Sequence, residues 1–344
     1  MLLDSFGRKL NYLRISITDR CNLRCLYCMP PEGVAWKPHE NILTFEEIIR
    51  IVKIVANMGV CNIKVTGGEP LLRRGTPSFL KQLRSVDGIK MVTLTTNGIL
   101  LGAYLGEAEK TGEDALPDGI NISLDALDCN RYERITRFAN SHNVNSSGKA
   151  IRELPRTILP QIDRLLEMNV NVKINCVPMR SVNEEEILPI ASLAKDKNII
   201  VRFIELMPFG SAHVYQPVSG TETKAIIEKA FGDLVPFNSV SGSGPAVYYS
   251  LSGFTGKIGF INAVTHGFCE TCNRLRLTSE GFLKLCLSNE TGIDLRGLLR
   301  SGANDDEIAR IIKDIVVKKP KSHSLSKVYG MMETHSEGLS GIGG

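Results

Sequence analysis

The chain reads DRCNLRCLYCMP at residues 19–30, directly after a strand-like run at residues 13–18. Cys21, Cys25 and Cys28 lie in this stretch at the spacing Cys-x3-Cys-x2-Cys, and no fourth cysteine is near them. Clustered cysteines in a cytosolic chain indicate metal ligation or catalysis, because cytosolic thiols are kept reduced. The stretch therefore predicts a metal centre just after the first strand.

Two kinds of metal centre fit these three cysteines, which we call the first trio. A structural zinc site needs a closed shell of four ligands, and His39 can supply the fourth. A [4Fe–4S] cluster ordinarily has four cysteine ligands, so three leave one iron open to a substrate or cofactor. The spacing by itself leaves both alternatives open.

Strand-like and helix-like segments alternate along the first two thirds of the chain. Thr44–Met58 has a helical pattern in which Thr44 is the expected N-cap and Glu47 completes a capping box. Further helical patterns cover Leu159–Met168 and Glu184–Lys195. The strand-like segments are Leu13–Thr18, Asn62–Thr66, Met91–Thr96, Ile120–Leu124, Val170–Val177 and Val201–Leu206. The alternation predicts an α/β fold with a mostly parallel sheet, open or closed into a barrel, whose site lies at the carboxyl ends of the strands.

The pattern changes after about residue 221, where short strands separated by turns replace the alternation. The expected strands are Ala246–Leu251, Lys257–Asn262, Arg274–Thr278 and Phe282–Leu287, and a helical pattern follows at Asp305–Val317. We therefore expect a larger domain over residues 5–220 and a smaller C-terminal α+β domain over residues 221–344.

A second trio of cysteines, Cys269, Cys272 and Cys286, has the spacing Cys-x2-Cys-x13-Cys. Zinc is a stronger alternative here, because His266 can complete a Cys3His shell. Arg274 and Arg276 share one face of the strand that follows Cys272, since side chains alternate along a strand. Two arginines beside a metal centre indicate an anionic or carbonyl-bearing ligand, although a solvated strand face gives the same pattern.

Composition excludes several other classes of protein. The net charge of +4 is too small to indicate a nucleic-acid groove, and no apolar run approaches the roughly 20 residues that span a bilayer. The N-terminus lacks the apolar run of a signal peptide, so we expect a cytoplasmic protein with no nucleic-acid or membrane partner. The other three of the nine cysteines, Cys61, Cys129 and Cys176, are isolated and suit ordinary packing positions.

The first trio, with Tyr27 directly before its last cysteine, resembles the signature of the radical S-adenosylmethionine (SAM) family. The segment Thr66-Gly67-Gly68-Glu69-Pro70 resembles that family's glycine motif. The resemblance implies an incomplete (β/α)6 TIM-like barrel and an open iron that binds SAM, which one electron cleaves to methionine and a 5′-deoxyadenosyl radical. The SAM-binding positions that it implies are Tyr27, Gly68, Thr95, Ser123 and Met207.

The second trio and the run Arg274-Leu275-Arg276 resemble the GTP 3′,8-cyclase family of molybdenum cofactor biosynthesis. This resemblance implies a second [4Fe–4S] cluster whose open iron binds guanine, hydrogen abstraction from C3′ of GTP, and attack of the carbon radical on C8. The implied catalytic residues are Arg274, Arg276, Gly343 and Gly344. No P-loop motif is present, so the triphosphate depends on dispersed cations. The implied substrate-binding cations are Arg14, Lys64, Lys173, Arg202, Arg274 and Arg276.

The same resemblance implies further partners: an electron donor and, downstream, cyclic pyranopterin monophosphate synthase, with a homodimer as an open option. Phe138–Glu153 is longer and more polar than the family's usual connection. Two alternatives remain at this point. One is another radical SAM enzyme with an auxiliary cluster, of the peptide maturase type, and the other is a non-catalytic zinc-binding module.

Overall fold

A computed structural model describes residues 1–138, 154–238 and 244–323. The predicted loop at residues 139–153 and the terminal Gly343 and Gly344 lie outside the described residues. All described strands belong to one twelve-stranded sheet with the order β12-β11-β10-β1-β2-β3-β4-β5-β6-β9-β8-β7. The strands are β1 (Tyr12–Ser16), β2 (Asn62–Thr66), β3 (Met91–Thr96), β4 (Gly119–Ser123), β5 (Asn171–Cys176), β6 (Ile200–Ile204), β7 (Val235–Pro236), β8 (Val247–Ser250), β9 (Lys257–Ile261), β10 (Arg274–Leu277), β11 (Phe282–Cys286) and β12 (Asn289–Asp294).

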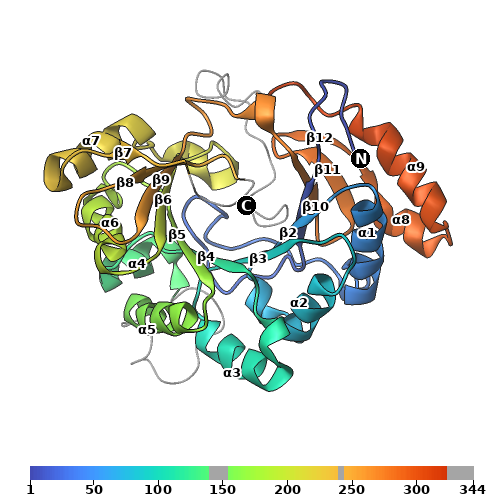
Figure 1. The fold of residues 1–344 in the computed structure, drawn as a ribbon, viewed down its shortest axis with the longest axis horizontal. Coiled ribbons are helices and arrows are strands. Elements are labelled where there is room, and N and C mark those ends of the chain that lie inside the picture. Colours follow the sequence, from blue (N-terminus) through green and yellow to red (C-terminus); the bar gives the residue numbers. More distant parts are fainter. Residues whose placement is uncertain (139–153, 239–243, 324–344) are drawn as a thin grey trace.

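The strands β1 to β6 are parallel and adjacent in chain order, and they form an open arc with helices on its outer side (Figure 1). The helices are α1 (Phe45–Asn57), α2 (Thr76–Arg84), α3 (Leu101–Thr111), α4 (Cys129–Thr136), α5 (Leu154–Glu167), α6 (Ile187–Asp196), α7 (Gly220–Phe231), α8 (Leu295–Arg300) and α9 (Asp305–Val316). Helices that follow parallel strands must cross back over the sheet, and here they cover its convex face. The fold is therefore α/β, an incomplete barrel with a C-terminal α+β extension, as predicted.

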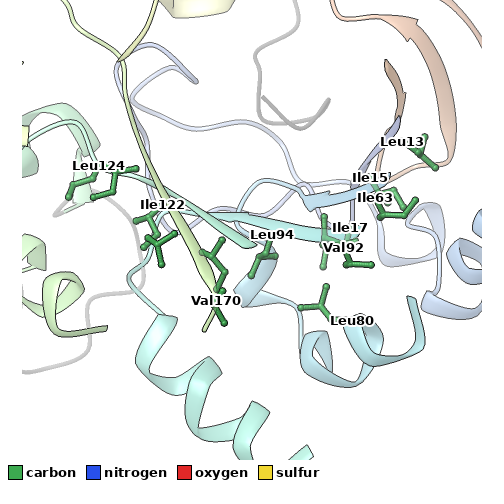
Figure 2. Close-up of a cluster of buried hydrophobic side chains, with 14 of the residues drawn as sticks. Leu13, Ile15, Ile17, Ile63, Leu80, Val92, Leu94, Ile122, Leu124 and Val170 are labelled. Carbon is green, nitrogen blue, oxygen red and sulfur yellow. The ribbon is translucent and has the colours of Figure 1, made fainter. Parts of the chain in front are cut away.

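The hydrophobic core lies between the sheet and these outer helices. Leu13 and Ile15 on β1 are fully buried, and Figure 2 shows Ile15 beside Ile63 of the neighbouring strand β2, with Val92 of β3 and Leu80 of α2 in the same apolar layer. Because side chains alternate along a strand, apolar residues at every second position leave the intervening residues on the concave face. The sequence of each strand thus gives one apolar face, which packs in the core, and one concave face whose side chains can contact a ligand.

The first helix shows how closely local signals determine an element. Thr44 caps α1 by accepting a hydrogen bond from the backbone N–H of Glu47, and the Glu47 carboxylate accepts one from the N–H of Thr44. The predicted capping box is confirmed, and such a box satisfies two N–H groups that the helix cannot. The predicted strands and helices generally begin and end within one or two residues of the observed ones, although α5 begins at Leu154.

The chain after residue 221 contributes strands to both sides of the arc. β9 pairs in parallel with β6, whereas β10 pairs in parallel with β1, so the arc is extended from opposite edges by one late segment (Figure 1). The division into domains at residues 5–220 and 221–344 stays a prediction, because strands from both parts share one sheet. Among the described residues, no helix has the length and apolar character to cross a membrane.

Candidate active site

The concave face of the arc encloses a cavity of about 390 Å³. Its wall contains most of the side chains that the sequence analysis singled out. From the implied SAM-binding set it includes Tyr27, Thr95, Ser123 and Met207. It also includes all six implied substrate-binding cations, namely Arg14, Lys64, Lys173, Arg202, Arg274 and Arg276, and all three cysteines of the second trio, Cys269, Cys272 and Cys286. Residues more than 250 positions apart in the sequence thus face one space.

Strand register explains why the cations converge. Arg14 on β1 is the direct neighbour of Lys64 on β2 and of Arg276 on β10. Residues that are paired across parallel strands share a face, so one inward position on β1 places all three inward. Arg14 is also followed, around the arc, by Lys173 on β5 and Arg202 on β6.

Burial, and secondly the charge of neighbouring cations, lowers the pKa values of several residues in this group. Burial, with the charges of Arg14 and Arg274, lowers the pKa of Arg276 to about 9. Burial, with Arg202, lowers the pKa of Lys173 to about 8, and the same effects hold the pKa of Lys64 well below its usual range. Burying like charges together is costly unless an anion balances them. The cavity is therefore suited to a polyanion.

The carboxylates of the cavity wall do not provide that balance. In the part of the chain that the structure describes, Asp118 and Glu205 are the acidic wall residues. Asp118 pairs with Arg84, and Glu205 accepts hydrogen bonds from the backbone N–H groups of Val264 and Thr265. Both carboxylates are thus engaged elsewhere.

Two asparagines orient Arg202 and were missed from the sequence. Its Nε donates to Oδ1 of Asn175 at 2.9 Å, and a terminal nitrogen donates to Oδ1 of Asn121 at 2.6 Å. Asn121 and Asn175 occupy the inward positions of β4 and β5, in register with Lys173 and Arg202. Strand alternation places both asparagines inward, and this alternation was the signal in the sequence that could have identified them.

The loop of the first trio leaves the end of β1 and is held by the glycine motif after β2. The N–H of Gly68 donates to the carbonyl of Thr18, and that of Glu69 to the carbonyl of Arg20, each at 2.7 Å. A Cβ on Gly68 would lie 2.2 Å from the Arg20 carbonyl oxygen, so only glycine permits this approach. Gly68 contacts the backbone of the loop, whereas the other implied SAM-binding residues line the cavity.

Glu69 secures the same loop from beneath. Its buried carboxylate accepts hydrogen bonds from the hydroxyl of Thr96 and the N–H of Asn97, both at 2.7 Å. Burial raises the pKa of Glu69 to about 7 in spite of these bonds. The side chain of Asn97 in turn donates to Asn22 inside the first trio's loop at 2.8 Å. The ends of β2 and β3 are thereby tied to the cysteines.

Tyr27 joins the first trio to the far side of the arc. Its hydroxyl donates to Oδ2 of Asp125 at 2.7 Å, and Oδ1 of Asp125 accepts the N–H of Val177 at 2.8 Å. Burial raises the pKa of Asp125 to about 6. The carboxyl group follows Ser123 by two residues, and sequence reasoning did not assign it a role.

The donor set of the first trio fits an iron–sulfur cluster. Burial raises the pKa values of Cys21 and Cys28 to about 12, so these thiols need a nearby metal charge to ionise. In residues 1–138, 154–238 and 244–323, no three His, Cys, Asp or Glu side chains form a group that could hold a metal ion. Cysteine thiolates are the usual ligands of iron–sulfur clusters, so Cys21, Cys25 and Cys28 would hold the cluster.

The second trio lies in a more cationic environment. Burial raises the pKa of Cys272, but the charges of Lys319 and Arg274 outweigh it and bring the pKa to about 7. The guanidinium of Arg274 lies 4.6 Å from the ring centroid of Phe268, which is the residue before Cys269. Lys319, a cavity residue that sequence reasoning did not find, is buried at 3% exposure.

A small apolar cluster connects the two trios. Phe209, which is fully buried, packs against Cys28, Met207 and Leu287. Cys28 belongs to the first trio, and Leu287 directly follows Cys286 of the second. The Phe209 side chain therefore contacts a cysteine of the first trio and the residue next to a cysteine of the second.

An open, mainly parallel α/β arc with a three-cysteine loop after its first strand is the architecture of a radical SAM enzyme. A family model described as Radical SAM superfamily matches residues 15–194, and one described as Molybdenum Cofactor Synthesis C matches residues 199–325. The crystal structure of Streptococcus suis SuiB bound to S-adenosylmethionine aligns with 96% of this chain and 76% of its own, with a TM-score of 0.59. At 15% identity, that likeness shows the fold alone.

Relatives that align with nearly the whole chain identify the particular family within this class of enzymes. The GTP 3′,8-cyclase of Clostridium perfringens strain 13 is 41% identical over 321 residues, which cover 93% of this chain and 94% of the relative. That of Moorella thermoacetica is 41% identical over 327 residues, with coverages of 94% and 95%. The chain belongs to the GTP 3′,8-cyclase family. Membership of this family implies SAM and a [4Fe–4S] cluster as cofactors and GTP as the substrate. It supports neither the peptide maturase alternative nor the alternative of a zinc-binding module.

Proposed function

We propose that the chain converts GTP to (8S)-3′,8-cyclo-7,8-dihydroguanosine 5′-triphosphate, the first step of molybdenum cofactor biosynthesis, in the cavity between the two trios. One observation carries the proposal: six cations and the second trio share this cavity, and the first trio adjoins it through Tyr27 and the Phe209 cluster. A triphosphate needs several cations to balance its charge, and this wall supplies them.

On the SAM side, Cys21, Cys25 and Cys28 hold the first [4Fe–4S] cluster. Tyr27, Thr95, Ser123 and Met207 line the space where SAM binds, and Gly68 acts by letting the cysteine loop approach β2. When bound, the cluster and SAM supply the one-electron chemistry that removes a hydrogen atom from the substrate. The chain's own part is to orient the two ligands and exclude water.

On the GTP side, Cys269, Cys272 and Cys286 would hold a second [4Fe–4S] cluster, which would bind the guanine of the substrate. Arg274 and Arg276 flank it and interact with the substrate, and Arg276 assists the final reduction. The cationic wall formed by Arg14, Lys64, Lys173 and Arg202 binds the triphosphate, at about 1.5–3 kcal/mol per charge-assisted hydrogen bond. Gly343 and Gly344, which lie outside the described residues, remain predicted catalytic residues.

The proposal extends to the cellular setting. All nine cysteines are free thiols in the structure, which suits the reducing cytoplasm. The reaction requires an external electron donor, and its product passes to cyclic pyranopterin monophosphate synthase.

An anaerobic comparison of wild type with Cys269→Ser tests the proposal. We expect wild type to contain about eight irons per chain and to consume GTP, whereas the variant contains about four and makes no product. Cys129→Ser is the matched control, since Cys129 belongs to neither trio and opens α4. Wild-type protein that holds only zinc, or that cleaves SAM without consuming GTP in the presence of a reductant, would refute the proposal.

A further inference from the structure

Residues 319–321 form the link that follows α9, and they contact the segments that carry the second trio, with Lys319 itself on the cavity wall. The ammonium of Lys319 donates to the backbone carbonyl of Arg274 at 2.9 Å and also to that of Leu285. These carbonyls belong to two neighbouring antiparallel strands, β10 and β11. One buried side chain therefore crosses the pair of strands at their cysteine-bearing ends.

The position of these two carbonyls relates Lys319 to the cysteines. Arg274 follows Cys272 by two residues, and Leu285 directly precedes Cys286. Thirteen residues separate the two cysteines in the sequence, so their distance depends on what joins the strand ends. The Lys319 ammonium joins the two strand ends through its hydrogen bonds to these carbonyls. Burying a lysine is costly unless its ammonium is hydrogen-bonded in this way.

Arg8 completes the arrangement from the other end of the chain. Its guanidinium donates to the carbonyl of Cys269 at 2.7 Å, to that of Pro320 at 2.7 Å and to that of Lys321 at 3.0 Å. The buried carboxylate of Asp4 pairs with its Nε at 2.5 Å. Arg8 therefore ties the remaining cysteine of the trio to the link that carries Lys319.

We propose that Lys319 and Arg8, acting through residues 319–321, are positioning residues that hold the three cysteines of the second trio at the spacing a cluster requires. The inference rests on the proposed second cluster. Lys319 also places a positive charge beside Cys272 and Cys286, on the wall of the same cavity. A nearby positive charge favours the reduced, more negative form of a cluster, so Lys319 raises its reduction potential.

The test compares Lys319→Met with Lys318→Met in full-length protein reconstituted anaerobically with iron and sulfide. Methionine keeps most of the side-chain length and volume but cannot donate, whereas Lys318 is exposed and serves as the control. We expect iron in Lys319→Met to fall from about eight towards about four per chain, with the first cluster's electron paramagnetic resonance signal and its change on adding SAM retained. Two clusters with a lowered potential at the second would also support the proposal.

If Lys319→Met holds both clusters at full occupancy with the wild-type reduction potential, the proposal is overturned. Wild type with only about four irons would instead show that the second cluster itself is absent. If Lys319→Met does not fold, the double variant Asp4→Asn, Arg8→Met replaces it, because it removes a buried pair together and leaves no unpaired charge. That variant should lose the second cluster's iron, and full retention of both clusters with the wild-type potential would again overturn the proposal.

Discussion

Replacing Gly68 with alanine tests whether the first trio depends on the close approach of β2 to its loop. The new Cβ would lie 2.2 Å from the Arg20 carbonyl oxygen, 2.5 Å from the Arg20 carbonyl carbon and 2.8 Å from the carbonyl oxygen of Asp19. These atoms are backbone, so they cannot rotate away as a side chain would. The loop must move, and the 2.7 Å hydrogen bond from Glu69 N–H to Arg20 is weakened or lost.

The cost can be worked from these contacts. Overpacking costs about 1–3 kcal/mol and a lost hydrogen bond about 1 kcal/mol, so we expect the free energy of unfolding to fall by about 2–4 kcal/mol. Moving the loop also displaces Cys21, so iron loading and SAM binding should fall with it. Urea denaturation of the apo protein measures the first effect, and anaerobic iron analysis with SAM titration measures the second.

Gly106→Ala is the matched control for this experiment. Gly106 lies within α3, and a Cβ there would meet nothing within 4 Å. Alanine in a helix interior should stabilise the protein by up to about 1 kcal/mol relative to glycine. If Gly68→Ala unfolds at the wild-type urea concentration and binds iron and SAM normally, the close-approach argument is wrong.

Three further predictions address the cationic wall, the buried acids and the fold. Arg202→Ala should weaken GTP binding by about 10-fold to 150-fold in calorimetry, because it removes a contact worth about 1.5–3 kcal/mol. The control Arg310→Ala, at an exposed position, should bind GTP as wild type does. Equal GTP affinities of the two variants would contradict the assignment of the cavity to GTP. Burial raises the pKa of Asp125 to about 6 and of Glu69 to about 7. Near these pH values the two carboxyl groups therefore bind more protons in the folded apo protein than in the unfolded chain. The free energy of unfolding should consequently fall as the pH rises through these values. Asp125→Asn should reduce this pH dependence of the free energy of unfolding, and an unchanged pH dependence would contradict the raised pKa of Asp125. Thr44→Ala should lower the free energy of unfolding by about 1 kcal/mol by removing the α1 cap, with GTP affinity as in wild type.

Much of the parallel arc could be predicted because its signals are local. Alternating residues on β1 to β6 separate an apolar face from a polar one, and the inward positions of Arg14 and Lys64 follow from that alternation alone. The three cysteines of the first trio lie within eight residues and are therefore close in space, whereas Cys286 comes near Cys272 only because β11 pairs with β10.

What could not be predicted depends on contacts between distant segments. Nothing in the sequence around β10 indicates that it pairs with β1. The loss of strand–helix alternation near residue 221 is visible in the sequence, but not that the strands beyond it extend the sheet at both edges. Lys319 and Arg8 resemble ordinary surface cations in the sequence, because their burial depends on carbonyl groups supplied by other segments. Asp125 was missed because its partner, Tyr27, is 98 residues away.

The pairing of β1 with β10 has a consequence for how the protein is made. Arg8 binds the carbonyl of Cys269, 261 residues further along, and β10 supplies the strand beside β1. A nascent chain in which β10 has not yet been made therefore presents an unpaired β1 edge and lacks one wall of the reaction chamber. We expect the iron–sulfur clusters to be inserted only after β10 has paired with β1.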